Sequence, residues 1–140
     1  RPAGRIDDVR TSLWEHMWED AGIIRDADSL ERAKNKLSEL DTQLDTVGVA
    51  ESNLAYNLTW HDWLNLKNLI LVSKAVVAAA TAREDSRGAH YRTDYPEVRD
   101  IENSTYTVVQ MKDGEVTLGT EPVEFSIVKP GETLLDEDAA

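Results

Sequence analysis

The sequence predicts a mainly α-helical fold: a three-helix bundle of the spectrin-repeat type, followed by a small antiparallel β hairpin or sheet. Through the first part of the chain, apolar residues recur at spacings of three and four, the period of a helix facing a core. After Gly88 the pattern changes to short β-favouring runs around Asp113-Gly114, a dipeptide typical of tight hairpin turns. We expect residues 1–98 to form the bundle, ending in a Ser-Arg-Gly-Ala-His loop. Residues 99–140 should add the hairpin and an acidic tail to the same domain.

The first predicted helix covers residues 6–21. Asp7 and Asp8 lie in its first turn, where carboxylates oppose the positive end of the helix dipole. Gly22 is expected to end the helix in the left-handed conformation that glycine adopts without steric cost. The apolar face consists of Ile6, Val9, Leu13 and Met17.

The second predicted helix has the most regular apolar face. Asp28 with Glu31 three residues later predicts a capping box at its start. Leu37 lies at the centre of the apolar face, so replacing it with alanine should cost about 2–5 kcal/mol of stability. The apolar positions are Leu30, Ala33, Leu37, Leu40 and Leu44.

The third predicted helix runs from Thr59 to about Arg83, with Thr59 and Asp62 as its start signal. Apolar residues occupy nearly all of its faces, which indicates burial against more than one partner. Two companion helices do not suffice for this, so we expect a neighbour outside the chain. Four tryptophans leave two interpretations open, ordinary core packing or a patch covered by another domain or subunit; they are Trp14, Trp18, Trp60 and Trp63.

The β region is predicted to contain two strands and a candidate third. Residues 105–110 and 115–119 flank the turn, and residues 123–128 have the composition of a further strand. Pro130-Gly131 should end regular structure.

Composition excludes several classes of function. The chain has 140 residues, which is one domain, and no cysteine, which excludes disulfides, thiolate catalysis and iron–sulfur ligation. A net charge of −12 makes nucleic acid and anionic lipid poor partners. The acidic tail, with Glu132 and Asp136–Asp138, is interpreted as a solvated terminus. The longest apolar run, residues 69–82, is shorter than the roughly 20 residues that cross a bilayer, so no direct membrane insertion is expected.

Residues 83–97 hold the densest functional chemistry, with three arginines, one histidine and four carboxylates around a glycine. Arginine grips carboxylates bidentately, and histidine transfers protons near neutral pH. The segment therefore predicts either an ion-pair network that ends a helix, or a dicarboxylate or domain-interface site. His16, His61 and His90 are too far apart in the sequence to suggest a metal site.

The same segment resembles a known family. Arg83-Glu-Asp-Ser-Arg-Gly-Ala-His-Tyr-Arg92, followed by Asp94-Tyr95-Pro96, is similar to the C-terminal signature of succinate dehydrogenase and fumarate reductase flavoproteins. L-aspartate oxidase, a relative, has a similar arginine–glycine–histidine segment. The resemblance covers most of residues 5–130. Its weaker parts are residues 65–69 and 75–80, which resemble the family's last long helix, and the opening helix with Met17 and residues 22–25.

The resemblance implies an FAD-dependent oxidoreductase that interconverts succinate and fumarate. In that family the FAD-binding and capping domains precede this region, and the chain contains no Gly-x-Gly-x-x-Gly fingerprint. We therefore assign it no catalytic, cofactor-binding or metal residue. FAD should belong to the full-length protein and not to this chain, which should be inactive alone.

The resemblance also suggests partners. We expect five residues to lock the chain onto its own FAD-binding and capping domains: Ser86, Arg87, His90, Arg92 and Asp94. An iron–sulfur subunit is the second expected partner, and the expected location is the cytoplasm or, through partner subunits, the inner face of the membrane. Two alternatives stay open, an L-aspartate oxidase-like C-terminal domain and a stand-alone helical interaction module. Ala89 and the long hairpin tail favour the respiratory type over the oxidase.

Overall fold

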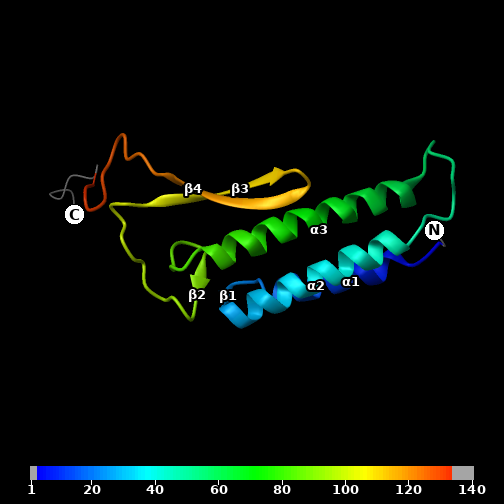
Figure 1. Cartoon of the computed structure of the whole chain (residues 1–140), viewed down its shortest axis with the longest axis horizontal. Helices are drawn as coiled ribbons and strands as arrows, with labels where there is room; N and C mark the ends of the chain where they lie inside the picture. The colour runs from blue at the N-terminus through cyan, green and yellow to red at the C-terminus, as the bar shows by residue number, and fades with distance from the viewer. Residues whose placement is uncertain (1–2, 134–140) are drawn as a thin grey trace, which may run out of the picture.

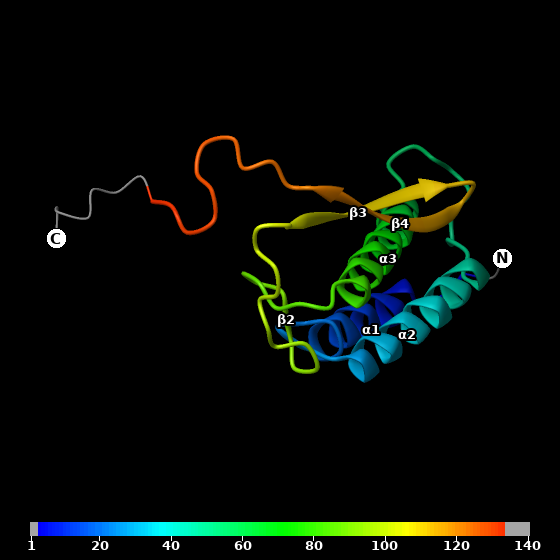
Figure 2. The same ribbon diagram turned by 60° about the vertical axis from the view of Figure 1, so that its left-hand side comes forward.

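The computed structural model of the chain describes residues 3–133, which form three helices with a β hairpin lying over the third (Figures 1 and 2). The hairpin covers the side of α3 that faces away from α1 and α2. This confirms the predicted helical bundle followed by an antiparallel hairpin. The elements are α1 (Ile6–Glu19), β1 (Ile24–Arg25), α2 (Ala27–Thr46), α3 (Leu58–Ala82), β2 (Tyr91–Arg92), β3 (Thr105–Lys112) and β4 (Glu115–Pro122).

The end of α1 differs from the prediction at Gly22. The helix ends with the backbone N–H of Asp20 donating to the carbonyl of His16 at 2.9 Å, and Gly22 does not adopt a positive φ. A glycine is still required there, because a Cβ atom would lie 2.2 Å from the carbonyl oxygen of Trp18. The constraint is the close approach of the departing chain to the helix, and the predicted left-handed cap was wrong.

The caps of α2 and α3 also lie upstream of the predicted ones. α2 starts after Asp26, whose Oδ1 accepts from the Ser29 N–H at 2.7 Å while the Ser29 hydroxyl accepts from the Asp26 N–H at 3.0 Å. This is the same reciprocal capping box with serine in the place of glutamate, so the predicted Asp28–Glu31 pair was wrong. At α3 the cap is Asn57, which accepts from the Trp60 N–H at 2.9 Å. The predicted cap at Thr59 was therefore wrong as well.

The core lies between the three helices and is dominated by leucine. Leu37 is 1% exposed, which confirms its predicted central position. Trp63 packs against the edge of the core, and its indole N–H donates to the carbonyls of Leu44 and Val47. The largest fully buried side chains are Leu13, Leu30, Leu37, Leu40, Leu44, Leu66, Ile70, Val9 and Val77.

Two small sheets complete the fold. β3 and β4 pair antiparallel around Asp113 and Gly114, whose φ values of 52° and 84° are those that a tight hairpin turn needs. β1 and β2 pair in parallel at one end of the bundle, an unpredicted sheet that joins segments far apart in the sequence. Residues 123–128 form no strand, so the predicted third strand was wrong. The chain leaves the hairpin there, after Val123 donates its N–H to the Ser104 carbonyl.

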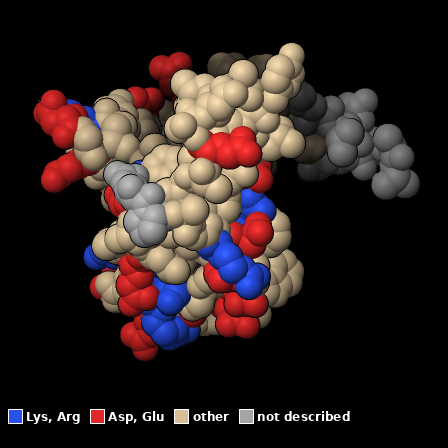
Figure 3. All heavy atoms as spheres, turned by 90° about the vertical axis from the view of Figure 1, so that its right-hand side faces the viewer, with Lys and Arg blue, Asp and Glu red and all other residues tan. Residues whose placement is uncertain are grey.

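Charged side chains of both signs are denser over the lower part of the face in Figure 3 than over its upper part. Seen from the end that carries loop 47–57, blue and red side chains are interspersed over the α1–α2 side, whereas the upper part is tan with several separate groups of red side chains (Figure 3). Glu132 of the predicted acidic tail is exposed, and Asp136–Asp138 lie outside the described residues.

By length and composition alone α3 would be able to cross a bilayer, with 25 residues and a mean hydropathy of 1.3 in its most apolar window. It is longer than the apolar run in the sequence because the helix continues on the N-terminal side of that run. Core helices pass the same test. α3 buries Leu66, Ile70 and Val77 inside the bundle, although only 22% of its most apolar window is buried. The length criterion is therefore weak evidence for a membrane span.

Candidate functional site

The structure brings together the five predicted site residues at the end of the bundle where α3 ends and β1 pairs with β2 (Figure 1). One further aspartate and two further arginines join them. We call this group the arginine cluster, and it consists of Arg25, Arg83, Asp85, Ser86, Arg87, His90, Arg92 and Asp94.

Arg92 is the buried centre of the cluster, with its side chain 3% exposed. Its Nε and Nη2 donate to the two carboxylate oxygens of Asp94 at 2.9 and 2.6 Å. Its Nη1 donates to the carbonyls of Thr81 and Arg83 at 2.9 and 3.1 Å, so it satisfies acceptors that the end of α3 leaves open. Asp94 also accepts from the Ala27 N–H at 3.0 Å, which connects this pair to the start of α2.

The Arg92–Asp94 pair favours the charged form of both partners. Donating hydrogen bonds to Asp94 raises the pKa of the Arg92 guanidinium, and accepting them from Arg92 lowers the pKa of the Asp94 carboxyl. Ser86 fixes the loop around the pair: its hydroxyl accepts from the Arg92 N–H at 2.9 Å and donates to the Tyr95 carbonyl at 2.8 Å.

Arg87 ties down the segment that leads to the hairpin. Its Nε donates to the Val98 carbonyl at 3.0 Å, its Nη2 to the Asp100 carbonyl at 2.9 Å, and its Nη1 to the Ser104 hydroxyl at 2.6 Å. It also pairs with the buried carboxylate of Asp85 at 3.2 Å. All three guanidinium nitrogens of Arg87 thus have partners within the chain.

The surroundings of His90 favour its neutral form. Arg25 donates from Nη1 to His90 Nδ1 at 3.1 Å, so Nδ1 is an acceptor and the proton lies on Nε2, 3.3 Å from the Arg83 carbonyl. Burial lowers the pKa of His90, and the charges of Arg25 and Arg83 add to this effect against the opposing hydrogen bond to the Arg83 carbonyl. Both ring nitrogens therefore have partners within the chain.

Arg25 was not among the predicted site residues, although it holds the cluster to the first half of the chain. Its Nε donates to the carbonyls of Ala21 and Gly22 at 3.1 and 2.7 Å, beyond the end of α1. It lies 65 positions from His90, and no local pattern marks it. Only the β1–β2 pairing brings the two residues together.

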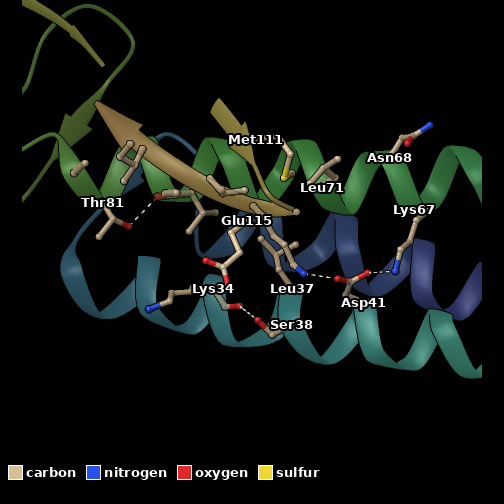
Figure 4. A pocket seen from close by; sticks show the side chains of 17 residues that line it. Lys34, Leu37, Ser38, Asp41, Lys67, Asn68, Leu71, Thr81, Met111 and Glu115 are labelled. Carbon is tan, nitrogen blue, oxygen red and sulfur yellow. Dashed lines mark hydrogen bonds and ion pairs between the residues drawn. The ribbon is translucent and has the colours of Figure 1, made fainter. Parts of the chain in front are cut away.

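A second polar group lies beneath the hairpin. Asp41 of α2 pairs with Lys67 of α3 at 2.6 Å and with Lys74, at the floor of a groove of about 1030 Å³ between α2, α3 and the hairpin (Figure 4). Burial raises the pKa of Asp41, but the two lysines outweigh this effect and hold that pKa below its ordinary value. Sequence reasoning missed this group, because three charged residues on two helices look like solvent-facing positions.

Two interpretations were open for the four tryptophans, core packing or an exposed patch, and the tryptophans divide between them. Trp63 packs on the core, whereas Trp14 and Trp18 are 61% and 73% exposed. Trp60 is half-buried and lies edge-on to His61. Within residues 3–133, no group of three or more His, Asp or Glu side chains is arranged to hold a metal ion.

The chain matches the family model described as the fumarate reductase flavoprotein C-terminus over residues 10–134. It is 33% identical to the fumarate reductase flavoprotein subunit of Mycobacterium tuberculosis over 91% of this chain and 22% of that protein. It is 30% identical to the 8-methylmenaquinol:fumarate reductase flavoprotein subunit of Wolinella succinogenes over 82% of this chain and 19% of that protein. L-aspartate oxidase of Pyrococcus horikoshii is 36% identical over 74% of this chain and 17% of its own length.

Solved structures agree on the fold. E. coli quinol fumarate reductase FrdA superposes with a TM-score of 0.84 at 23% identity, over 92% of this chain and 23% of that one. The Mycobacterium smegmatis Sdh1 complex superposes with a TM-score of 0.70 at 29% identity, over 89% of this chain and 21% of that one. The chain thus spans about a fifth of the length of such proteins. It belongs to the fumarate reductase flavoprotein C-terminal family, whose members include succinate dehydrogenase-type subunits.

Proposed function

We propose that the chain is the C-terminal helical domain of an FAD-dependent subunit that interconverts succinate and fumarate, and that it supplies packing and not reacting groups. The observation that carries this proposal is the family match over residues 10–134, in a chain that spans 14–22% of the length of the curated relatives it matches. The remainder of such a subunit would bind FAD and the dicarboxylate. A hydride would pass between dicarboxylate and flavin there, and an iron–sulfur subunit would accept the electrons.

The arginine cluster would give this domain a rigid end that packs against the FAD-binding and capping domains. Its side chains are engaged with one another and with the chain's own carbonyls, through Arg92–Asp94, Arg25–His90 and Arg87–Ser104. Ser86, Arg87, His90, Arg92 and Asp94 would therefore act by holding the shape of the loop that meets the other domains. None of them would touch substrate.

An L-aspartate oxidase-like subunit is the second candidate. Three relatives with that name are 36–37% identical to this chain, including the enzyme of Yersinia pestis. For the first candidate we expect a cytoplasmic protein that reaches the inner face of the membrane through partner subunits.

The test is to purify the complete subunit that contains this chain and to measure three properties. These are bound FAD by absorbance, fumarate reduction with a reduced viologen dye, and L-aspartate oxidation by peroxide release. Bound FAD with fumarate reduction supports the first candidate, and peroxide release with L-aspartate supports the second. A subunit without FAD would overturn both.

The packing role has its own test in the same subunit. Arg87→Ala removes the donors that hold residues 98–104, so it should lower FAD occupancy and turnover together by at least a few-fold. Arg5→Ala, at an exposed ion pair before the start of α1, is the matched control and should change neither. Unchanged FAD occupancy and turnover in Arg87→Ala would overturn the packing role.

A further inference from the structure

The open face of α3 is an apolar stripe that nothing in the chain covers among the residues described. Leu69, Val72, Val76 and Ala79 follow one another at spacings of three, four and three, which places them on one side of the helix. Val72 is 59% exposed, and Leu69 and Val76 are exposed as well. The buried side of α3, with Leu66, Ile70 and Val77, faces α1 and α2.

The hairpin covers a different side of α3. The groove beneath it is lined by Lys67, Leu71, Lys74 and Ala78 of that helix, each one or two positions away from the stripe. α3 therefore carries apolar residues on three sides, of which the bundle covers one and the hairpin covers another that also holds Lys67 and Lys74. A contiguous apolar side left open on a helix indicates an interface.

The stripe ends in a hollow with a positive rim. This hollow has a volume of about 470 Å³. Val76 and Ala79 belong both to the stripe and to the apolar floor of the hollow, and Arg25, Arg83 and His90 stand around it. Arg83 and Arg87 share the single carboxylate of Asp85, and Arg25 contacts the neutral His90 ring and carbonyl oxygens. Positive charge therefore exceeds negative charge here, in a chain whose net charge is −12.

We propose that the preceding part of the same polypeptide docks along Leu69, Val72, Val76 and Ala79, and places a carboxylate in the hollow beside Arg25 and Arg83. The inference rests on the proposed function. It adds which face of α3 is covered and which part of the polypeptide covers it. Two observations select the occupant. The chain spans about a fifth of its relatives' length, so a much larger body precedes it in them, and the excess of guanidinium groups is complementary to an acidic residue.

The chain contains no cysteine, which permits a direct test by thiol labelling of the complete subunit. Val72→Cys is a small change at a position whose side chain faces outward. The matched control is Gln43→Cys, an exposed helical position on α2. Labelling with a maleimide would be followed by mass spectrometry of the peptide, so that cysteines elsewhere in the subunit do not contribute. We expect Val72→Cys to label at least ten-fold more slowly than Gln43→Cys in the native subunit, and equally fast in urea.

Equal native rates at the two positions would overturn the proposal. Protection that appears only when partner subunits or phospholipid vesicles are added would overturn it too, because the occupant would then not be the same polypeptide. FAD occupancy, measured on the same samples, distinguishes a failure of the proposed function from a failure of the proposed docking face. A subunit without FAD contradicts the proposed function, whereas a subunit with FAD and a freely labelled Val72→Cys contradicts only the docking face.

The acidic contact is tested with Val76→Cys, at the edge of the hollow. Adding Arg83→Gln should speed its labelling several-fold, since the carboxylate of the occupant loses a partner, and Arg83→Lys should restore most of the protection. If Arg83→Gln leaves the labelling rate unchanged, no carboxylate of the occupant depends on Arg83, and that part of the proposal fails.

Discussion

Arg92 and Asp94 meet through two parallel hydrogen bonds of 2.9 and 2.6 Å, and the arginine side chain is almost completely buried. The pair connects three elements, because Arg92 also binds carbonyls at the end of α3 while Asp94 binds the first N–H of α2. Planar, two-point contact of this kind depends on the guanidinium fork.

Replacing Arg92 with alanine should strongly destabilise the chain. It leaves the carbonyls of Thr81 and Arg83 without the Arg92 donor and Asp94 with only the Ala27 N–H, and losing hydrogen bonds of a buried charged group costs about 1.5–3 kcal/mol. Arg92→Lys should recover little, since an ammonium group does not reproduce the two-point contact. Urea unfolding followed by circular dichroism measures both. Arg5→Ala, at an exposed pair, should cost only about 0–1 kcal/mol, and an equal loss in both alanine variants would contradict the argument from the burial of Arg92.

Stability should fall as His90 becomes protonated. Burial lowers its folded-state pKa below the ordinary value of 6.5, so the unfolded chain binds the proton more tightly. The resulting stabilisation is complete above pH 6.5 and is lost as the pH falls through the folded-state pKa. Asp41 and Asp94, whose pKa values lie below 3.8, contribute in the same direction but only at lower pH.

His90→Gln should flatten the dependence of the unfolding free energy on pH just below 6.5, whereas His61→Gln, at an exposed position, should keep the slope. Urea titrations at several pH values on both sides of 6.5 provide the measurement. If the unfolding free energy of His90→Gln still depends on pH in this range, a group other than His90 causes the dependence.

Leu37→Ala should cost about 2–5 kcal/mol, because the side chain is 1% exposed and its removal leaves a cavity in the core between the helices. Val72→Ala removes atoms from a 59% exposed side chain and should change stability by about 0.5 kcal/mol or less. Thermal unfolding of the two variants provides the comparison. Similar melting midpoints would remove Leu37 from the core.

Asp26→Ala should cost about 1 kcal/mol, since the Ser29 N–H at the start of α2 loses its acceptor. Asp26→Asn should restore most of this, because the amide oxygen accepts the same hydrogen bond. Asp28→Ala should cost less, as Asp28 contributes only its charge in the first turn. If Asp28→Ala cost more than Asp26→Ala in urea unfolding, the result would favour Asp28 as the cap, as the sequence suggested.

The sequence was most informative where a pattern is local. The first two helices followed from apolar spacing, the third from its long apolar run, and the hairpin from Asp113-Gly114. Helix starts were misplaced by two residues at both Asp26 and Asn57, because several residues with capping side chains lie close together and the choice depends on where the loop arrives. The third strand failed because residues 123–128 have β-forming composition but no neighbouring strand to pair with among the described residues.

For the site, the sequence indicated which residues gather but not how they bond. Residues 83–97 predicted a dense polar cluster, and the ion-pair network is present in Arg92–Asp94 and Arg87–Asp85. Arg25 and Asp41 were missed because their partners lie on other elements, at separations that no short window contains. The docking role of Ser86, Arg87, His90, Arg92 and Asp94 stays a prediction.

The pairing of β1 with β2 constrains the length of α3 relative to that of α2. β1 lies just before the start of α2, and β2 lies beyond the end of α3. The two strands therefore meet only if α3 ends at the same height along the bundle axis at which α2 begins. One extra turn in α3 alone would carry β2 about 5.4 Å along the axis, more than the roughly 3.3 Å between neighbouring strand residues. Natural insertions and deletions should therefore collect in the 49–56 connection at the opposite end, where the chain can absorb them without changing the register.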